Sequence, residues 1–338
     1  MDMADRISGS FAGMAVGDAL GLLVEGHDRE IAINFVKAFF EDRDKGALPD
    51  PFGQYSDDTQ LTRELAASMV THRRFDPDDY AGRISNLFAS GRVIGGGRTT
   101  IEAAQRLATG IRWSEAGAPI GAAGNGAAMR AAPIGWLYRA SSSELVHAAS
   151  QQAMITHHDY NAVGGSILVA QAVSLIIDSG GTVDNGDFLL SVAQPVSSTA
   201  PQFANMVYDL RHFLSLPLDT AHSIISQLGS QDAAGEWQGT ISPHVIPSVL
   251  WALFSYLRSR PNYLEVIKMA ISGGGDTDTT AAMSGALAGA ECGIAMLPDD
   301  LTSRLNDKSQ WGLRKLMSLS NAVAEIRCSH AGFGRANS

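Results

Sequence analysis

Two short segments of the sequence set carboxylates beside hydroxyl groups: Ser-Asp-Asp-Thr at 56–59 and Asp-Thr-Asp-Thr at 276–279. Each follows a turn-like stretch and precedes an apolar run with helical spacing, so each is expected at a helix N-terminus. Ser, Thr and Asp are also preferred N-cap residues, so capping alone would explain either segment. If the two helix starts converge, however, four carboxylates would raise one another's pKa values unless a cation lies between them.

The ligand atoms in these two segments are all hard oxygens. Such atoms favour Mg²⁺, Mn²⁺ or Ca²⁺ over zinc or copper. Two cations held in this way would orient and activate water. A helical prenyl-transferase motif is excluded because Leu61 stands four residues after Asp57, and an EF-hand is excluded because Leu287 is the twelfth residue counted from Asp276.

Clustered glycines are the second chemical signal. The chain has 35 glycines, and they gather at 95–97, 124–126, 164–165, 180–181 and 273–275. Some of these glycines simply end helices, whereas a glycine loop before a helix exposes backbone amides to an anion. The P-loop and the dinucleotide fingerprint are excluded, because no Gly-Lys-Ser/Thr follows these runs and no predicted strand precedes them.

Helical periodicity dominates the elements that must position these segments. The first helix carries Gly9, Gly13 and Gly17 on one face, where small residues let a neighbouring helix come close. Further helices are expected after Asp57 and Asp76 and over 243–257, 262–271 and 277–296. Strand-like runs bounded by hairpin turns are scarce. We expect an all-α, compact single domain of many helices over residues 1–328, with a polar tail over 329–338.

Composition excludes several classes of protein. The 338 residues include 25 Lys+Arg and 35 Asp+Glu, and the net charge of −10 argues against a nucleic-acid-binding protein. The hydrophobic share of 45% excludes a disordered chain. Two cysteines, Cys292 and Cys328, cannot build a disulfide framework and suit a reducing compartment.

The apolar stretch 162–177 is short for a membrane span and is expected to be a core helix. We therefore predict a soluble, cytoplasmic protein that does not engage a membrane, and the sequence does not indicate its oligomeric state.

Five segments, taken in order, resemble the ADP-ribosylhydrolase family, also called ADP-ribosylglycohydrolases. They are 17–21 with Glu25, 56–59, 124–130, 156–157, and 274–279 with the helix that follows through 289. The family includes the dinitrogenase-reductase-activating glycohydrolase and the ADP-ribosylarginine and ADP-ribosylserine hydrolases. Each segment alone is a weak signal, but the ordered set covers most of the chain and is highly specific.

The resemblance implies a compact all-α fold with a binuclear centre of two divalent cations, Mg²⁺ or Mn²⁺. The residues that match the family's metal ligands are Ser56, Asp57, Asp58, Asp276, Asp278 and Thr279. Among them, Asp278 is in the position that bridges the two cations. The candidate catalytic residues are Asp57 and Asp58, which orient or deprotonate water, and Glu25. Glu25 matches a glutamate near the metals that gates substrate access.

The resemblance also implies a set of contacts to ADP-ribose. The residues that match them are Gly95, Gly96, Gly97, Gly124, Asn125, Gly126, Met129 and His157. His157 matches a histidine on the diphosphate side. Ala122 and Ala123 depart from the pattern, because some members carry a serine and an aromatic residue there. This departure leaves the adenine-side contacts open.

The activity implied by the resemblance is metal-dependent removal of ADP-ribose from a modified protein side chain. The bond cleaved would be an N- or O-glycosidic bond at ribose C1. The partner would be an ADP-ribosylated protein or an ADP-ribose-containing small molecule. Two alternatives remain: a module that binds ADP-ribose or neutralises a toxin by occupancy alone, and a binuclear-metal hydrolase of another N-glycoside, phosphoester or ADP-ribose derivative.

Overall fold

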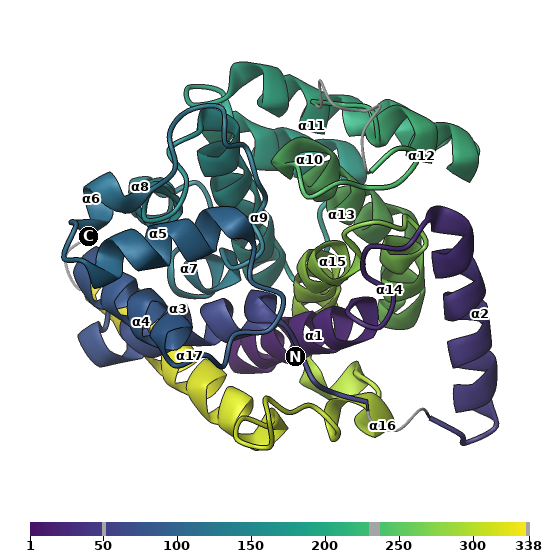
Figure 1. The fold of residues 1–338 in the computed structure, drawn as a ribbon, viewed down its shortest axis with the longest axis horizontal. Helices are drawn as coiled ribbons and strands as arrows, with labels where there is room; N and C mark the ends of the chain where they lie inside the picture. Colours follow the sequence, from purple (N-terminus) through teal and green to yellow (C-terminus); the bar gives the residue numbers. More distant parts are fainter. Residues whose placement is uncertain (49–51, 230–236, 336–338) are drawn as a thin grey trace.

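The computed structural model describes residues 1–48, 52–229 and 237–335. These residues form seventeen α-helices and two short 3₁₀-helices, and their β-type pairing is limited to four isolated bridges. The prediction of an all-α protein is confirmed (Figure 1). The α-helices are α1 (Met3–Gly21), α2 (Arg29–Asp44), α3 (Asp57–His72), α4 (Pro77–Ala89), α5 (Arg98–Ala108), α6 (Trp113–Ala116), α7 (Ala132–Leu137), α8 (Ser143–Met154), α9 (Tyr160–Ser179), α10 (Asn185–Ala193), α11 (Pro201–Phe213), α12 (Leu218–Ile225), α13 (Val245–Ser259), α14 (Tyr263–Ile271), α15 (Thr277–Cys292), α16 (Asp299–Thr302) and α17 (Leu313–Arg335). The 3₁₀-helices are η1 (Gln194–Val196) and η2 (Ile294–Met296).

Helices α1 and α15 pack against each other in the middle of the molecule through glycines (Figure 1). A Cβ atom placed on Gly13 would lie 2.5 Å from the carbonyl oxygen of Gly285, and one on Gly9 would collide with the carbonyl of Gly289. These pairs show that the two helices run antiparallel with their backbones in contact. The small-residue face predicted from Gly9, Gly13 and Gly17 is therefore the face that meets α15.

The same contact sets the distance between the C-terminus of α1 and the N-terminus of α15. A Cβ on Gly21 would lie 2.5 Å from the Cα of Asp278, and the hydroxyl of Thr277 donates a hydrogen bond to the Gly21 carbonyl at 2.8 Å. The first turn of α15 is thereby held beside the end of α1. The acidic residues on both helices are brought together as a result.

Helix α9 is the core helix expected over 162–177. It is the one described helix long and apolar enough to span a membrane, but 83% of its most apolar 18-residue window is buried inside the protein. Asp159 caps its N-terminus, and Gly180 ends it in the left-handed conformation. Burial of nearly the whole window identifies α9 as part of the hydrophobic core, which runs without a break from α1 to α17.

Three predicted boundaries differ from the observed ones. Helix α15 ends at Cys292 rather than at Met296, because Gly293 adopts a φ of +75° and the chain continues as η2. Helix α13 begins at Val245 with His244 as its cap, two residues after Pro243. Helix α17 continues to Arg335, past the predicted start of a polar tail at 329. The last three residues lie outside the described part of the chain, and the division into domain and tail stays a prediction.

Candidate functional site

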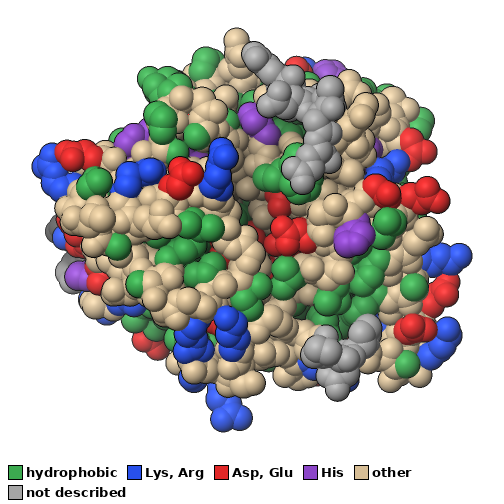
Figure 2. Space-filling model, in the orientation of Figure 1, with side chains coloured by type: hydrophobic (Ala, Val, Ile, Leu, Met, Phe, Trp, Pro, Cys, Tyr) green, Lys and Arg blue, Asp and Glu red, His purple; other side chains and the backbone are tan. Residues whose placement is uncertain are grey.

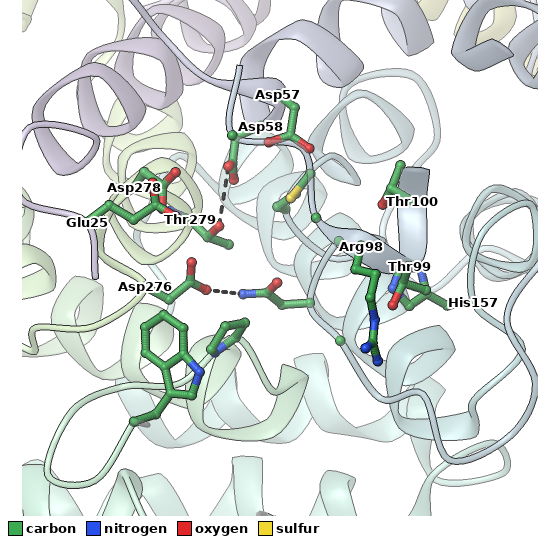
Figure 3. A pocket seen from close by; sticks show the side chains of 18 residues that line it. Glu25, Asp57, Asp58, Arg98, Thr99, Thr100, His157, Asp276, Asp278 and Thr279 are labelled. Carbon is green, nitrogen blue, oxygen red and sulfur yellow. Dashed lines mark hydrogen bonds between the residues drawn. The ribbon is translucent and has the colours of Figure 1, made fainter. Parts of the chain in front are cut away.

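The N-termini of α3 and α15 open into one pocket of about 250 Å³ (Figure 3). Asp57 and Asp58 form the first turn of α3, and Asp278 and Thr279 lie in the first turn of α15, just after Asp276. All five residues line the pocket. The hydroxyl of Thr279 donates a hydrogen bond to Asp58 Oδ2 at 3.3 Å. The two acidic segments therefore converge, which is the condition under which their carboxylates would raise one another's pKa values.

Ser56 caps α3 and supports Asp58 from below the pocket surface. Its Oγ accepts a hydrogen bond from the Asp58 amide at 3.2 Å and donates one to Asp58 Oδ2 at 3.0 Å. Ser56 thus caps the helix and also places its hydroxyl oxygen beside the carboxylate of Asp58. Ser56 is completely buried and does not line the pocket, so its assignment as a metal ligand stays a prediction.

Asp18 is a buried acid in α1 that lies within the matched segment 17–21 but is not among the predicted site residues. Its carboxylate accepts hydrogen bonds from the Ser56 amide at 2.8 Å and from the amide and hydroxyl of Thr59 at 3.0 and 2.6 Å. Burial raises its pKa to about 6, while these hydrogen bonds oppose the rise. Asp18 therefore ties the start of α3 to α1. The available signal was a lone acid in the middle of an apolar, glycine-spaced helix.

Two groups of carboxylates in the described residues have the spacing to hold a metal ion. Oxygens of Asp18, Asp58 and Asp278 lie within 4.8 Å of one another, and so do oxygens of Glu25, Asp276 and Asp278. Asp278 belongs to both groups. This arrangement suits two adjacent cations that share one carboxylate.

The electrostatics of the cluster favour a bound cation. Burial raises the pKa of Asp57 to about 7 and that of Asp276 to about 6, and neighbouring acids add to the burial effect. Burial together with the surrounding carboxylates also places the pKa values of Asp58 and Asp278 well above the usual range. The oxygens Asp57 Oδ2 and Asp58 Oδ1 are buried and accept no hydrogen bond in the described structure. Buried acceptors left free in an acidic cluster fit a site for Mg²⁺ or Mn²⁺.

The glycine loop before α15 aims Asp276 into the pocket. Gly275 has a φ of +74°, and a Cβ there would collide with the carbonyl of Ile241. That carbonyl accepts the Asp276 amide at 2.9 Å. Glycine is required because the loop passes directly against residue 241 in this conformation.

Asn125 braces Asp276 from the other wall of the pocket. Its side-chain amide donates to Asp276 Oδ2 and, at 2.8 Å, to Ser248 Oγ. The backbone amide of Asn125 donates to the Pro243 carbonyl at 3.0 Å. The structure thus brings the predicted ligand-binding loop 124–126 into direct contact with the acidic cluster.

His157 packs against the same loop, opposite the acidic residues (Figure 3). A Cβ on Gly124 would lie 3.2 Å from His157 Nε2, and one on Gly126 would lie 3.1 Å from Cε1, so both glycines make room for the ring. Burial lowers the pKa of His157 to about 3, and the nearby Arg130 adds to this effect. The imidazole is neutral at pH 7. Met129, also predicted for the site, lines the pocket while remaining almost fully buried.

The three glycines of the loop 95–97 do not all face the pocket. Gly95, with a φ of +76°, points toward Asp57, because a Cβ there would lie 3.5 Å from Asp57 Oδ1. Gly97 also lines the pocket. Gly96 instead faces Phe88, which a Cβ would approach to 3.1 Å. Gly96 does not line the pocket, and its contact with a ligand stays a prediction.

The lining is completed by Glu25 and by five residues outside the predicted set, which are Arg98, Thr99, Thr100, Trp237 and Pro243. Glu25 is partly exposed, and burial raises its pKa above the usual range. Arg98, whose side chain is 91% exposed, lies across the pocket from the acids, and Trp237 lines the pocket as well. The position of Arg98 directly after the glycine loop could have marked it as a site residue, whereas no sequence pattern marks Trp237. From outside, acidic side chains are visible in a hollow near the middle of the face (Figure 2).

Comparison with known proteins decides the family. A family model described as ADP-ribosylglycohydrolase matches residues 1–330. The chain belongs to the ADP-ribosylglycohydrolase family. It is 26% identical to ADP-ribosylhydrolase ARH3 of Xenopus tropicalis, over 91% of this chain and 93% of that one. It is also 26% identical to the ADP-ribosyl-[dinitrogen reductase] glycohydrolase of Rhodospirillum rubrum, over 95% and 97% of the two chains.

Comparison with a solved structure confirms the fold. The chain titled ADP-ribosylglycohydrolase-related protein complex superposes with a TM-score of 0.69 at 25% identity, and the match covers 96% of this chain and 99% of that one. The resemblance drawn from the five ordered segments is therefore confirmed. Members of the ADP-ribosylglycohydrolase family are hydrolases, and the clustered carboxylates of this chain have the spacing of a metal site.

Proposed function

We propose that this protein is a metal-dependent hydrolase that removes ADP-ribose from a modified protein side chain. The bond broken is the N- or O-glycosidic bond at C1 of the ribose next to that side chain. One observation carries the proposal: a single pocket is lined by members of two carboxylate groups that share Asp278 and by a glycine loop backed by His157. The carboxylates suit cations and a sugar, and the glycine loop suits an anionic ligand.

Two divalent cations, Mg²⁺ or Mn²⁺, would be held by the carboxylates. Asp18, Asp58 and Asp278 form one group and Glu25, Asp276 and Asp278 the other. Bound there, the cations would polarise ribose hydroxyls and lower the pKa of a water molecule. Ser56 and Thr279 belong to the same proposal as hydroxyl ligands.

The chain's own carboxylates would then handle the proton of the attacking water. Asp57 Oδ2 is buried and accepts no hydrogen bond in the described structure, so it is free to accept one from a water molecule. We assign Asp57, or its neighbour Asp58, the role of orienting the water and taking its proton. Glu25, at the open side of the cluster, would control access of the substrate.

The opposite half of the pocket would hold the diphosphate and the adjoining nucleoside. At Gly95, Gly97 and the loop 124–126, a ligand can come close to the protein backbone. His157 presents a polar atom of its ring on the same side. An ADP-ribosylated protein or an ADP-ribose-containing small molecule is the proposed partner. Two free cysteines, Cys292 and Cys328, support a reducing, cytoplasmic setting.

A direct experiment separates this enzyme from a module that only binds ADP-ribose. Calorimetry with ADP-ribose is run beside an assay that detects ADP-ribose released from a modified protein, both with Mn²⁺ present. We expect binding and release for the wild type and loss of release for Asp276→Asn. The control is Asp209→Asn, since Asp209 is a surface acid in α11 that is 56% exposed. Tight binding without release by the wild type would establish the binding module instead.

A further inference from the structure

A chain of hydrogen bonds leads from the interior of the protein to the imidazole in the pocket. Arg130 is completely buried. Its Nε donates to Gln152 Oε1 at 3.0 Å, and its Nη2 donates to the Gln152 carbonyl at 3.2 Å. The Gln152 amide is itself oriented, because its Nε2 donates to the Ala127 carbonyl at 2.8 Å. The guanidinium is therefore fixed in position, and one of its donors remains aimed at Thr156.

The hydroxyl of Thr156 stands between Arg130 and His157. Arg130 Nη2 lies 2.7 Å from Thr156 Oγ1, and Thr156 Oγ1 lies 2.7 Å from His157 Nδ1. A guanidinium can only donate, so the Thr156 oxygen accepts from Arg130. In the described structure, His157 is the remaining hydrogen-bond partner of the hydroxyl. Its single proton is therefore satisfied only by donation to Nδ1.

This direction of donation fixes the state of the ring. A neutral imidazole carries one N–H, and a nitrogen that accepts a hydrogen bond is the one without the proton. His157 is 1% exposed and lies near a buried guanidinium, so the doubly protonated cation is disfavoured. The proton must then be on Nε2, the nitrogen that faces Gly124 at the pocket wall.

We propose that Thr156, held by Arg130, is a positioning residue that locks His157 in the tautomer with the proton on Nε2. His157 thereby presents a neutral N–H donor to an acceptor oxygen of the ligand. The choice of a diphosphate oxygen as this acceptor rests on the proposed function, whereas the tautomer itself does not. Because burial and the nearby Arg130 disfavour the doubly protonated ring, this donor keeps the same neutral form across the neutral pH range.

The test is nitrogen-detected NMR of the full-length protein labelled with ¹⁵N in its histidines. We expect His157 of the wild type to show a protonated Nε2 and a proton-free Nδ1. Thr156→Val, which keeps the shape but removes the hydroxyl, should mix the two tautomers. Thr156→Ser should restore the wild-type pattern. Thr302→Val, a buried threonine in α16, serves as the control and should change nothing.

Binding provides the second measurement. Thr156→Val should weaken ADP-ribose binding on the order of tenfold, with Thr156→Ser close to wild type. If Thr156→Val does not fold, His157→Gln and His157→Asn replace it. Gln places its amide N–H near the Nε2 position and Asn places it near Nδ1, so Gln should bind better.

The outcomes separate the inference from the proposed function. A proton on Nδ1 in the wild type, or an unchanged tautomer in Thr156→Val, would overturn the positioning role. A changed tautomer with unchanged ADP-ribose affinity would overturn the role of His157 as ligand donor. A correct tautomer in a protein that releases no ADP-ribose would contradict the proposed function alone.

Discussion

Asp18 in α1 and Thr59 in α3 are joined by two hydrogen bonds to a single carboxylate oxygen, from the Thr59 hydroxyl at 2.6 Å and from its amide at 3.0 Å. The other oxygen of Asp18 accepts from the Ser56 amide. An acid in an apolar helix thus fixes the start of the helix that carries Asp57 and Asp58. Asp18 also has an oxygen within reach of Asp58 and Asp278.

Asp18→Asn should weaken both the fold and the metal site. The asparagine amide would face backbone and hydroxyl donors, which leaves at least one of them unpaired at a cost of about 1–3 kcal/mol. Loss of a carboxylate that orients the ligands should reduce cation affinity about 10- to 100-fold. Urea unfolding without cation and a Mn²⁺ titration measure the two effects. Wild-type values in both would show that Asp18 is dispensable.

Gly13→Ala should destabilise the protein by about 1–3 kcal/mol, because the new methyl group would be forced against the backbone of α15. The matched control is Gly82→Ala in α4, where a Cβ would meet no atom within 4 Å. That change should be neutral or stabilise by up to about 1 kcal/mol, since alanine suits a helix better than glycine. Equal unfolding free energies for the two variants would contradict the close packing of α1 on α15.

Divalent cations should stabilise the protein more in weakly alkaline than in acidic solution. The raised pKa values of Asp57, near 7, and of Asp18 and Asp276, near 6, mean that the metal-free fold holds protons that the unfolded chain has released. The contribution of these groups to stability is present below their ordinary pKa of 3.8 and is lost as the pH rises toward about 7. A bound cation replaces those protons.

The pH dependence of stabilisation by cations is measured by thermal unfolding at about pH 5 and about pH 8, each with excess EDTA and with excess Mn²⁺. The increase in Tm caused by Mn²⁺ should be larger at the higher pH. An increase that is equal at both values, or larger in acid, would show that the cation does not bind this carboxylate cluster.

Asn125→Ala should weaken cation binding by removing the donor that faces Asp276. That hydrogen bond lowers the pKa of Asp276, so its loss should make protons compete better with the cation. We expect about a tenfold increase in the Kd for Mn²⁺ near pH 6. Ser248→Ala leaves the contact between Asn125 and Asp276 in place and should have the smaller effect. The reverse order would contradict the bracing role of Asn125.

The sequence predicted those parts of the site that depend on local chemistry. Asp57 and Asp278 could be placed because hydroxyls and acids at helix starts have a recognisable pattern, and Gly13 could be placed on a packing face by its helical spacing. Asp18 lies in the matched segment 17–21, but its contacts could not be predicted, because its partners Ser56 and Thr59 are 38 and 41 residues away in the sequence. Trp237 also lines the pocket, but no motif in the sequence marks it as a site residue.

Metal-dependent glycohydrolase activity can be measured as the release of ADP-ribose from proteins modified on arginine and on serine. Each substrate is incubated with the wild-type protein in Mg²⁺, in Mn²⁺ and in excess EDTA. We expect release from at least one substrate with one of the cations, abolition of release by EDTA, and recovery when the cation is returned in excess. Full release in excess EDTA would contradict a metal-dependent glycohydrolase.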